Sequence, residues 1–161
     1  MLDLLNEFST YVNKTWGKEA GVKVHCSAGQ SCSDYIDPRT GEPVNFNFLP
    51  MFADSSLGIF PHTVQAYSLD DPVANTYGNK NFKEIEDYMM YEASLNNRTV
   101  AFYAETAYWV NVDIDLPLFL PIYAQRRLYD LRRIVKLENA MNTNIHGQMI
   151  FDSGWEVIYS L

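Results

Sequence analysis

The sequence predicts an α/β protein in which helices alternate with parallel strands, and three observations favour this class. Apolar residues recur with helical spacing in three segments, whereas four shorter segments are rich in β-branched and aromatic residues. The two kinds of segment alternate along the chain, which is typical of a parallel sheet. The expected strands begin near residues 22, 63, 99 and 147, a spacing that suits strand–helix units.

Four elements are expected in the first half of the chain: a helix over 2–16, a strand over 22–26, a long loop over 27–61 and a strand over 63–69. The helix follows from the spacing of Leu4, Phe8 and Trp16, and Gly17 predicts its end. The loop follows from repeated Pro and Gly residues. Loops of this length are uncommon in compact domains and are often functional.

Four more elements are expected in the second half: a helix over 82–93, a strand over 99–103, a helix that begins near Pro117 and Pro121, and a strand over 148–151. The last helix is expected to pack through one apolar face formed by Leu128, Leu131, Ile134 and Val135. Its arginines, which lie within 126–133, are expected mostly elsewhere on its surface.

Two architectures fit this order of elements. The first is part of a (β/α)8 barrel, and the alternative is an open doubly wound sheet. A complete barrel usually takes about 250 residues, so a chain of 161 residues supplies roughly half of one. We therefore expect residues 1–161 to form a single α/β domain, as a half-barrel fragment of a larger catalytic domain.

The composition indicates a folded protein and disfavours two kinds of partner. Hydrophobic residues make up 47% of the chain and aromatic residues 14%, whereas disordered chains are poor in both. A formal net charge of −8 disfavours nucleic acid and anionic membranes, because both need a basic surface. No transmembrane segment or signal peptide is recognised, so a soluble protein is expected. The compartment and the oligomeric state stay open.

Four residues carry possible covalent modifications that the sequence leaves undecided. Cys26 and Cys32 are close enough along the chain for a disulfide, but unpaired thiols are the simpler interpretation. Asn13 and Asn97 each begin an Asn-x-Ser/Thr triplet, which often arises by chance.

Candidate site residues follow from the rule that parallel α/β folds bind ligands at the carboxyl ends of their strands. The candidates are His25, Cys26 and Ser27 after the first strand, Asp70 and Asp71 after the second, Glu105, Tyr108 and Trp109 after the third, and Asp152, Trp155 and Glu156 after the fourth. Carboxylates on separate strands can act as a general acid paired with a base or nucleophile. We therefore predict Glu105 as a catalytic residue, with Glu156 or Asp152 as its partner.

Substrate binding is assigned to aromatic residues and to two further carboxylates. The predicted substrate-binding residues are Tyr108, Trp109, Trp155, Asp70 and Asp71. Flat aromatic rings offer the apolar surface against which a sugar ring packs. A structural alternative exists for each residue, because strand-end acids often form turns, cap helices or pair with arginine, and tryptophans often fill cores.

No cofactor and no metal ligand are predicted. The chain lacks the glycine-rich motifs that bind nucleotide phosphates and the Gly-x-Ser-x-Gly motif of α/β-hydrolases. His25, His62 and His146 are scattered along the sequence, which argues against zinc.

The strand-end carboxylates and aromatics resemble the active-site rim of (β/α)-barrel glycoside hydrolases, without pointing to a named family. The resemblance covers about residues 63–156 and is carried by Glu105, Tyr108, Trp109, Trp155 and Glu156. It implies a carbohydrate-active hydrolase acting on a small-molecule or oligosaccharide substrate. In that case Glu105 matches one catalytic carboxylate, and Glu156 or Asp152 matches the other.

Two other functions remain as alternatives to the hydrolase. One is a non-catalytic α/β module that binds carbohydrate or protein. The other is a divalent-metal-dependent hydrolase that uses Asp70, Glu105 and Asp152, since carboxylate-rich sites suit hard cations.

Overall fold

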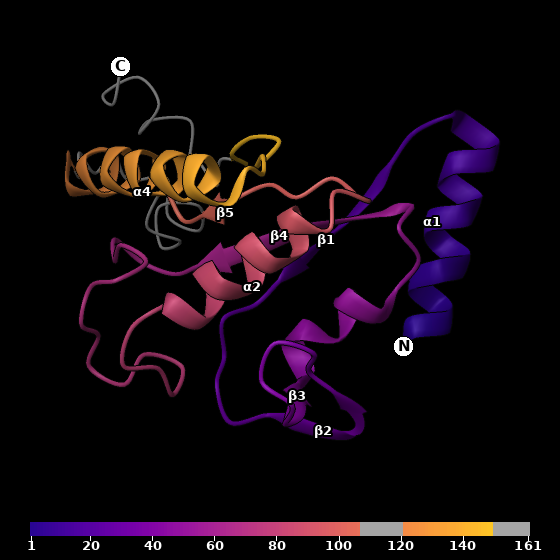
Figure 1. The fold of residues 1–161 in the computed structure, drawn as a ribbon, viewed down its shortest axis with the longest axis horizontal. Coiled ribbons are helices and arrows are strands. Elements are labelled where there is room, and N and C mark those ends of the chain that lie inside the picture. Colours follow the sequence, from indigo (N-terminus) through magenta and orange to yellow (C-terminus); the bar gives the residue numbers. More distant parts are fainter. Residues whose placement is uncertain (107–120, 150–161) are drawn as a thin grey trace, which may run out of the picture.

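The computed structural model describes residues 1–106 and 121–149 of the chain, and these form a mixed α/β fold (Figure 1). The elements are α1 (Leu2–Trp16), β1 (Ala20–Val24), β2 (Ser31–Ile36), β3 (Pro43–Asn45), the 3-10 helix η1 (Phe46–Phe52), β4 (Leu57–Thr63), α2 (Lys83–Ser94), β5 (Tyr103–Ala104) and α4 (Pro121–Met141). The predicted α/β class with a parallel sheet is confirmed.

The central sheet has the strand order β1-β4-β5, and both neighbouring pairs are parallel. Lys23 lies opposite Phe60 between β1 and β4, and His62 lies opposite Tyr103 between β4 and β5. A further parallel bridge joins Phe102 to Gln148, so the segment after α4 continues the sheet beyond β5. The sheet therefore grows from one side to the other in chain order.

The two faces of this sheet differ in chemistry because successive strand residues point to opposite sides. On one face Val24, Ile59 and Phe102 are buried in the main hydrophobic core, to which α2 and α4 contribute Met89 and Ile134. The other face carries two cross-strand pairs, Lys23 with Phe60 and His62 with Tyr103. One face of the sheet is thus apolar and packed by helices, and the other is polar and aromatic.

Helices α1 and α2 form where the sequence predicts them. Helix α1 ends at Gly17, which adopts the left-handed conformation with φ of 60° and donates its N–H to the Asn13 carbonyl. Helix α2 buries Ile85, Tyr88 and Met89 against the sheet. The buried side of α2 supplies most of its stability, whereas α1 buries only Ser9 and Val12 and exposes Leu4, Phe8 and Trp16.

The predicted strand over residues 63–69 is wrong. Strand β4 ends at Thr63, and Gln65 turns the chain with a φ of 56°. Val64 and Leu69 are apolar because they fill the core, not because they form a strand. Gly58 and Pro61 mask the true strand in the sequence, since both residue types are disfavoured inside strands.

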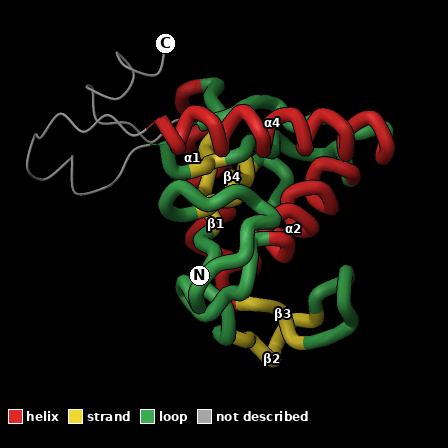
Figure 2. The backbone as a smooth tube through the Cα atoms, turned by 90° about the vertical axis from the view of Figure 1, so that its left-hand side faces the viewer, coloured by secondary structure: helices red, strands yellow, loops and turns green. Residues whose placement is uncertain are grey.

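The predicted loop over residues 27–61 contains regular structure instead. β2 and β3 form an antiparallel pair, and η1 leads from that pair toward β4. Figure 2 shows the pair apart from the central sheet, at the end of the molecule opposite α4. Cys26 and Cys32, at the beginning of this region, are unpaired thiols.

The predicted packing face of α4 is wrong at three of its four residues, and only Ile134 is buried as expected. The helix buries Tyr123, Arg127, Asp130 and Ile134, and it exposes Leu128, Leu131 and Val135. It packs against the turns that follow β4 and β5, whose backbone carbonyls need donors, and Arg127 supplies them. Neither α4, with its 21 residues, nor any other described helix is both long enough and apolar enough to cross a membrane.

Candidate functional site

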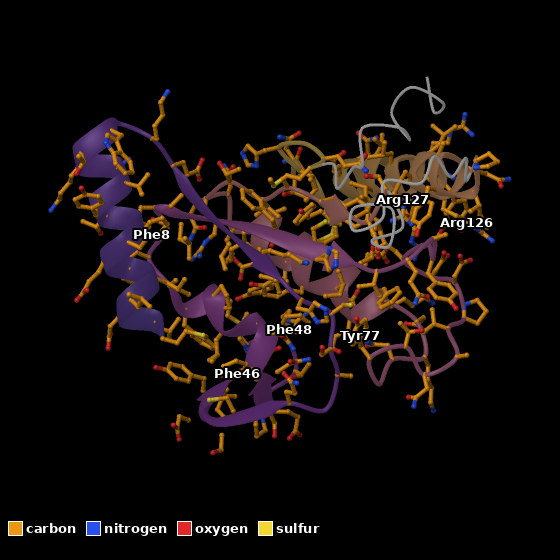
Figure 3. All side chains as sticks on the ribbon, turned by 180° about the vertical axis from the view of Figure 1, so that it is seen from behind. Phe8, Phe46, Phe48, Tyr77, Arg126 and Arg127 are labelled. Carbon is orange, nitrogen blue, oxygen red and sulfur yellow. The ribbon has the colours of Figure 1, made fainter. Side chains whose placement is uncertain are left out.

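The carboxyl ends of β1, β4 and β5 meet at a small polar cavity, which we call the strand-end cavity. It has a volume of about 190 Å³ and is lined by Lys23, His25, His62, Val64, Gln65, Tyr77 and Glu105. Seen from behind, Tyr77 and Arg127 lie on either side of these strand ends (Figure 3). This is the edge at which parallel sheets bind their ligands.

Glu105, the predicted catalytic residue, lies in this cavity and is held on both sides. It follows β5 directly and is 6% exposed. Its backbone N–H donates to the Thr63 carbonyl at 3.2 Å, and its own carbonyl accepts from Arg127 at 3.1 Å. Its carboxylate accepts a hydrogen bond from the backbone N–H of Gln65. The carboxylate position is therefore fixed by two neighbouring strand-end turns and by α4.

Gln65 presents that N–H because its backbone is in the left-handed region, with a φ of 56°. For a residue with a Cβ this conformation costs roughly 1–2 kcal/mol. Backbone strain of this kind persists where the surrounding structure enforces it, and it clusters at functional sites. Here the strained turn supplies a donor to the Glu105 carboxylate.

His25 follows β1 and lies in the cavity as a neutral imidazole. Its Nδ1 accepts the backbone N–H of Ser27 at 3.2 Å and is 2.7 Å from the Ser27 hydroxyl. Burial lowers the His25 pKa from its ordinary value, and the nearby Lys23 ammonium lowers it further. Because Nδ1 accepts, the proton of the neutral ring is on Nε2.

His62 is the second imidazole of the cavity, and it carries its proton on the other nitrogen. Its Nδ1 is 2.9 Å from the Tyr103 carbonyl. A carbonyl only accepts, so Nδ1 carries the proton. Burial, with a smaller effect from Lys23, lowers the His62 pKa to about 4. The ring is therefore neutral at pH 7, with an unprotonated Nε2.

The proximity of these two histidines was not predicted from the sequence, in which they are scattered. Their ring centres are 5.7 Å apart, although 37 positions separate them in the sequence. The register of β1 on β4 brings them together. A strand assigned to end at Thr63 would have placed His62 at the same sheet edge as His25, so the missed signal was the position of β4.

Two cations border the cavity. The Lys23 ammonium lies 5.6 Å from the centre of the Tyr103 ring. Arg127 reaches from the far side, forms an ion pair with Asp130 at 3.2 Å and donates to the Thr63 hydroxyl at 3.3 Å. The cavity therefore combines the Glu105 carboxylate and two neutral imidazole rings, with the cations Lys23 and Arg127 beside them.

Asp70 and Asp71, predicted to bind substrate, have protein partners. Asp70 accepts from Arg133 and from the Tyr129 hydroxyl, both at 3.0 Å. Asp71 closes a turn by accepting from the Ser68 N–H at 2.9 Å. These contacts match the turn and arginine-pairing alternatives raised for strand-end acids.

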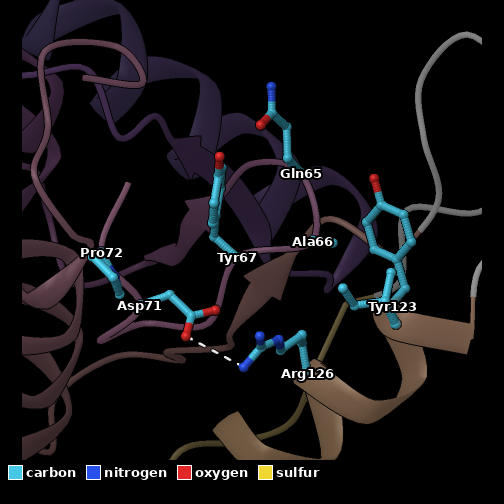
Figure 4. Close-up of a pocket in the computed structure, with 8 residues that line it drawn as sticks. Gln65, Ala66, Tyr67, Asp71, Pro72, Tyr123 and Arg126 are labelled. Carbon is cyan, nitrogen blue, oxygen red and sulfur yellow. Dashed lines mark hydrogen bonds and ion pairs between the residues drawn. The ribbon is translucent and has the colours of Figure 1, made fainter. Parts of the chain in front are cut away.

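Asp71 also borders a second and larger hollow, which we call the α4 cavity. It has a volume of about 580 Å³ and is lined by Gln65, Ala66, Tyr67, Asp71, Pro72, Ile122, Tyr123 and Arg126. Gln65 and Tyr67 come from the turn after β4, whereas Tyr123 and Arg126 come from α4 (Figure 4). Arg126 pairs with Asp71 at 3.3 Å. Gln65 lines both cavities, so the two adjoin.

Five predicted site residues, Tyr108, Trp109, Asp152, Trp155 and Glu156, lie outside the described residues. The pairing of Glu105 with a second carboxylate therefore stays a prediction. Within residues 1–106 and 121–149, no three His, Cys, Asp or Glu side chains are grouped to hold a metal ion.

No protein family, curated protein or solved structure matches this chain. Its function is therefore argued from the chemistry of the strand-end cavity.

Proposed function

We propose that this chain is part of a (β/α) barrel and that the strand-end cavity is the active site of a carbohydrate-active hydrolase. Glu105 acts there as acid/base or nucleophile. The observation that carries the proposal is the position of the Glu105 carboxylate. It lies in a cavity at the carboxyl edge of three parallel strands, where Lys23, Gln65, Tyr77 and two imidazoles can bind hydroxyl groups.

The strand order supports a barrel over an open doubly wound sheet. In a barrel each strand pairs with the next one along the chain, and helices cover only the outer face. In a doubly wound sheet the order reverses at a switch point and helices cover both faces. Here the order is β1-β4-β5 followed by Gln148, and α2 and α4 pack on the same apolar face.

The chemistry of the cavity suits general acid–base catalysis on a polyhydroxylated molecule. Glu105 supplies the carboxyl group, while Gln65, Tyr77 and two neutral imidazoles supply hydrogen bonds. A volume of about 190 Å³ is smaller than an ordinary ligand pocket of roughly 300–1,000 Å³. We propose that one sugar unit enters here and that the rest of the substrate extends into the α4 cavity.

The α4 cavity suits a second sugar unit because it presents aromatic rings. Tyr67 and Tyr123 stand on opposite walls (Figure 4) and offer apolar faces with polar tips. Gln65 lines both cavities, so the two proposed sugar sites are neighbours.

A hydrolase of this class needs a second carboxylate, and we propose Glu156 or Asp152 for that role. A separation of about 5 Å from Glu105 suits retention of configuration, and about 6.5–9.5 Å suits inversion. Both candidates follow the segment that pairs with β5 through Gln148, which leads toward the carboxyl edge.

Neither alternative function has an observation that favours it over the hydrolase. In the metal-dependent alternative Asp70 would be a ligand, but its carboxylate is bound by Arg133 and Tyr129. A binding module would use the same cavities without turnover.

The test is a screen of 4-nitrophenyl glycosides and reduced oligosaccharides with the full chain, with and without EDTA. We expect hydrolysis of at least one substrate, unaffected by EDTA and abolished in Glu105→Gln. Binding without hydrolysis would support the module. Hydrolysis that EDTA stops and Mg²⁺ or Mn²⁺ restores would support the metal-dependent enzyme.

A further inference from the structure

The two histidines that line the strand-end cavity carry opposite hydrogen-bonding groups at Nε2. In each ring Nδ1 is hydrogen-bonded within the protein, to the Ser27 N–H in His25 and to the Tyr103 carbonyl in His62. The partners assign the protons, so His25 has an N–H at Nε2 and His62 has a lone pair at Nε2. Neither Nε2 has a hydrogen-bond partner among the described residues. One ring is therefore a donor and the other an acceptor.

Burial, and then the cations beside them, keep both rings neutral by lowering the pKa of each. Lys23 and Arg127 are the cations beside His62, and both lower its pKa, as burial does more strongly. Glu105 is the carboxylate of the cavity lining, and it is bound by the Gln65 N–H. A neutral ring has one donor and one acceptor, so the opposite arrangement holds at pH 7.

We infer that His25 and His62 together bind one hydroxyl group of the substrate, with His25 donating to its oxygen and His62 accepting its proton. The inference rests on the proposed function for its choice of a polyhydroxylated substrate. The ring centres are 5.7 Å apart and both rings line the same small cavity, so one small polar group can reach both of them. The pair is thus a specificity determinant within the strand-end cavity.

The pairing of donor with acceptor selects hydroxyl groups over ions. A hydroxyl donates one hydrogen bond and accepts others, so it satisfies both rings. A carboxylate or sulfate only accepts, and its charge would face the unprotonated Nε2 of His62. An ammonium group only donates, and it would face the Nε2–H of His25. Leaving a buried polar group unpaired costs more than one hydrogen bond contributes.

Two matched variants remove the groups that face the cavity and keep the groups that hold the fold. His62→Asn retains an N–H near the position of Nδ1 for the Tyr103 carbonyl and loses the acceptor. His25→Asn retains an acceptor for the Ser27 N–H and loses the donor. Each variant should weaken polyol binding roughly 3- to 10-fold, the effect of one neutral hydrogen bond.

The experiment is nitrogen-15 NMR of the imidazoles in the full chain at pH 7.5. We expect His25 as the Nε2–H form and His62 as the Nδ1–H form. Titration with glycerol and D-glucose should then shift both Nε2 signals, whereas acetate and sulfate should not. The same form for both rings would overturn the inference. So would a response to the anions alone, or no response to either polyol at molar concentration.

Failure here is distinguishable from failure of the hydrolase. If no glycoside is cleaved but polyols shift both rings, hydroxyl binding stands without hydrolysis. If glycosides are cleaved in a Glu105-dependent way and the rings do not respond, the hydrolase stands and the hydroxyl pair is wrong.

Discussion

Glu105 and Asp70 occupy comparable places, in the chain segments that follow β5 and β4, yet their surroundings differ. Asp70 is bound by Arg133 and Tyr129 of α4, on the outer side of the molecule. Glu105 is bound by the backbone N–H of Gln65 and lines a cavity with two imidazoles. A carboxylate held by a neutral backbone group keeps its charge available, whereas one held by arginine is largely compensated.

A position at a strand end selects candidate site residues but does not by itself decide between them. The two carboxylates differ in which contact an arginine of α4 makes beside each of them. Arg133 pairs with the side chain of Asp70, whereas Arg127 donates to the backbone carbonyl of Glu105 and pairs with Asp130.

The largest effect is expected for Glu105→Gln. Loss of a general acid–base group should lower kcat roughly 10²–10⁴-fold, while the amide oxygen still accepts from Gln65 and preserves the fold. Steady-state kinetics on the substrate found in the screen gives the measurement. Asp70→Asn is the matched control, and equal losses in the two variants would erase the distinction between these carboxylates.

The next effect concerns the buried arginine that holds the turn of Glu105. Arg127→Met leaves Asp130 buried without its ion pair and frees the carbonyls of Tyr67 and Glu105. We expect a loss of roughly 3–5 kcal/mol in the free energy of unfolding, measured by urea denaturation. Arg126→Met, which removes an exposed pair with Asp71, should cost at most about 1 kcal/mol. Similar costs for both variants would mean that the Arg127 pair is not buried in solution.

A third prediction concerns Glu92, a carboxylate that an arginine contacts without compensating its burial. Glu92 is fully buried, and this burial raises its pKa to about 7 even though Arg98 lies 3.5 Å away. The folded state therefore holds a proton that the unfolded state releases above its ordinary pKa. The free energy of unfolding should fall as pH rises from about 4.5 to about 7.

Glu92→Gln removes this titration. The variant should gain on the wild type by roughly 1.4 kcal/mol per pH unit within that window, measured by urea denaturation at several pH values. Exposed Glu42→Gln controls for the change in net charge. A stability difference that does not vary with pH would show that Glu92 is ionised in the folded protein.

The smallest effect is expected for Asp70→Asn. Its pair with Arg133 is partly exposed, with both side chains about a quarter accessible. Such pairs contribute roughly 0.2–1 kcal/mol and are screened by salt. Denaturation in low salt and in about 1 M NaCl, where the Debye length is near 3 Å, should show the difference shrinking. A loss of several kcal/mol would place Asp70 in a structural role deeper than its contacts indicate.

The sequence predicted those parts of the fold that depend on local pattern. Helices α1 and α2 follow from apolar spacing, and Gly17 marks the end of α1 because it accepts a positive φ. Strand β4 was misplaced because Gly58 and Pro61 disfavour strands locally, and only pairing with both neighbours overrides that preference. Most of the packing face of α4 was missed because it is built around Arg127, which donates to backbone carbonyls, and not around apolar residues alone.

In the candidate site, too, only the features that depend on local sequence were predicted. Glu105 was found because its position after a β-run is a local property of the chain. The histidine pair was not found, because it depends on the register of two strands and on the true end of β4. The opposite protonation of the two rings depends on Ser27 and Tyr103, which only the folded backbone brings to them.

The chain-order growth of the sheet has a consequence for biosynthesis. A ribosome adds about 5–20 residues per second, so each new strand emerges seconds after the one on which it docks. No strand has to wait for a later one to be inserted beside it. At every stage, however, the most recent strand is an unpaired edge that another chain can join. A translational pause after Thr63 would leave β4 in that state and would give another chain time to join it.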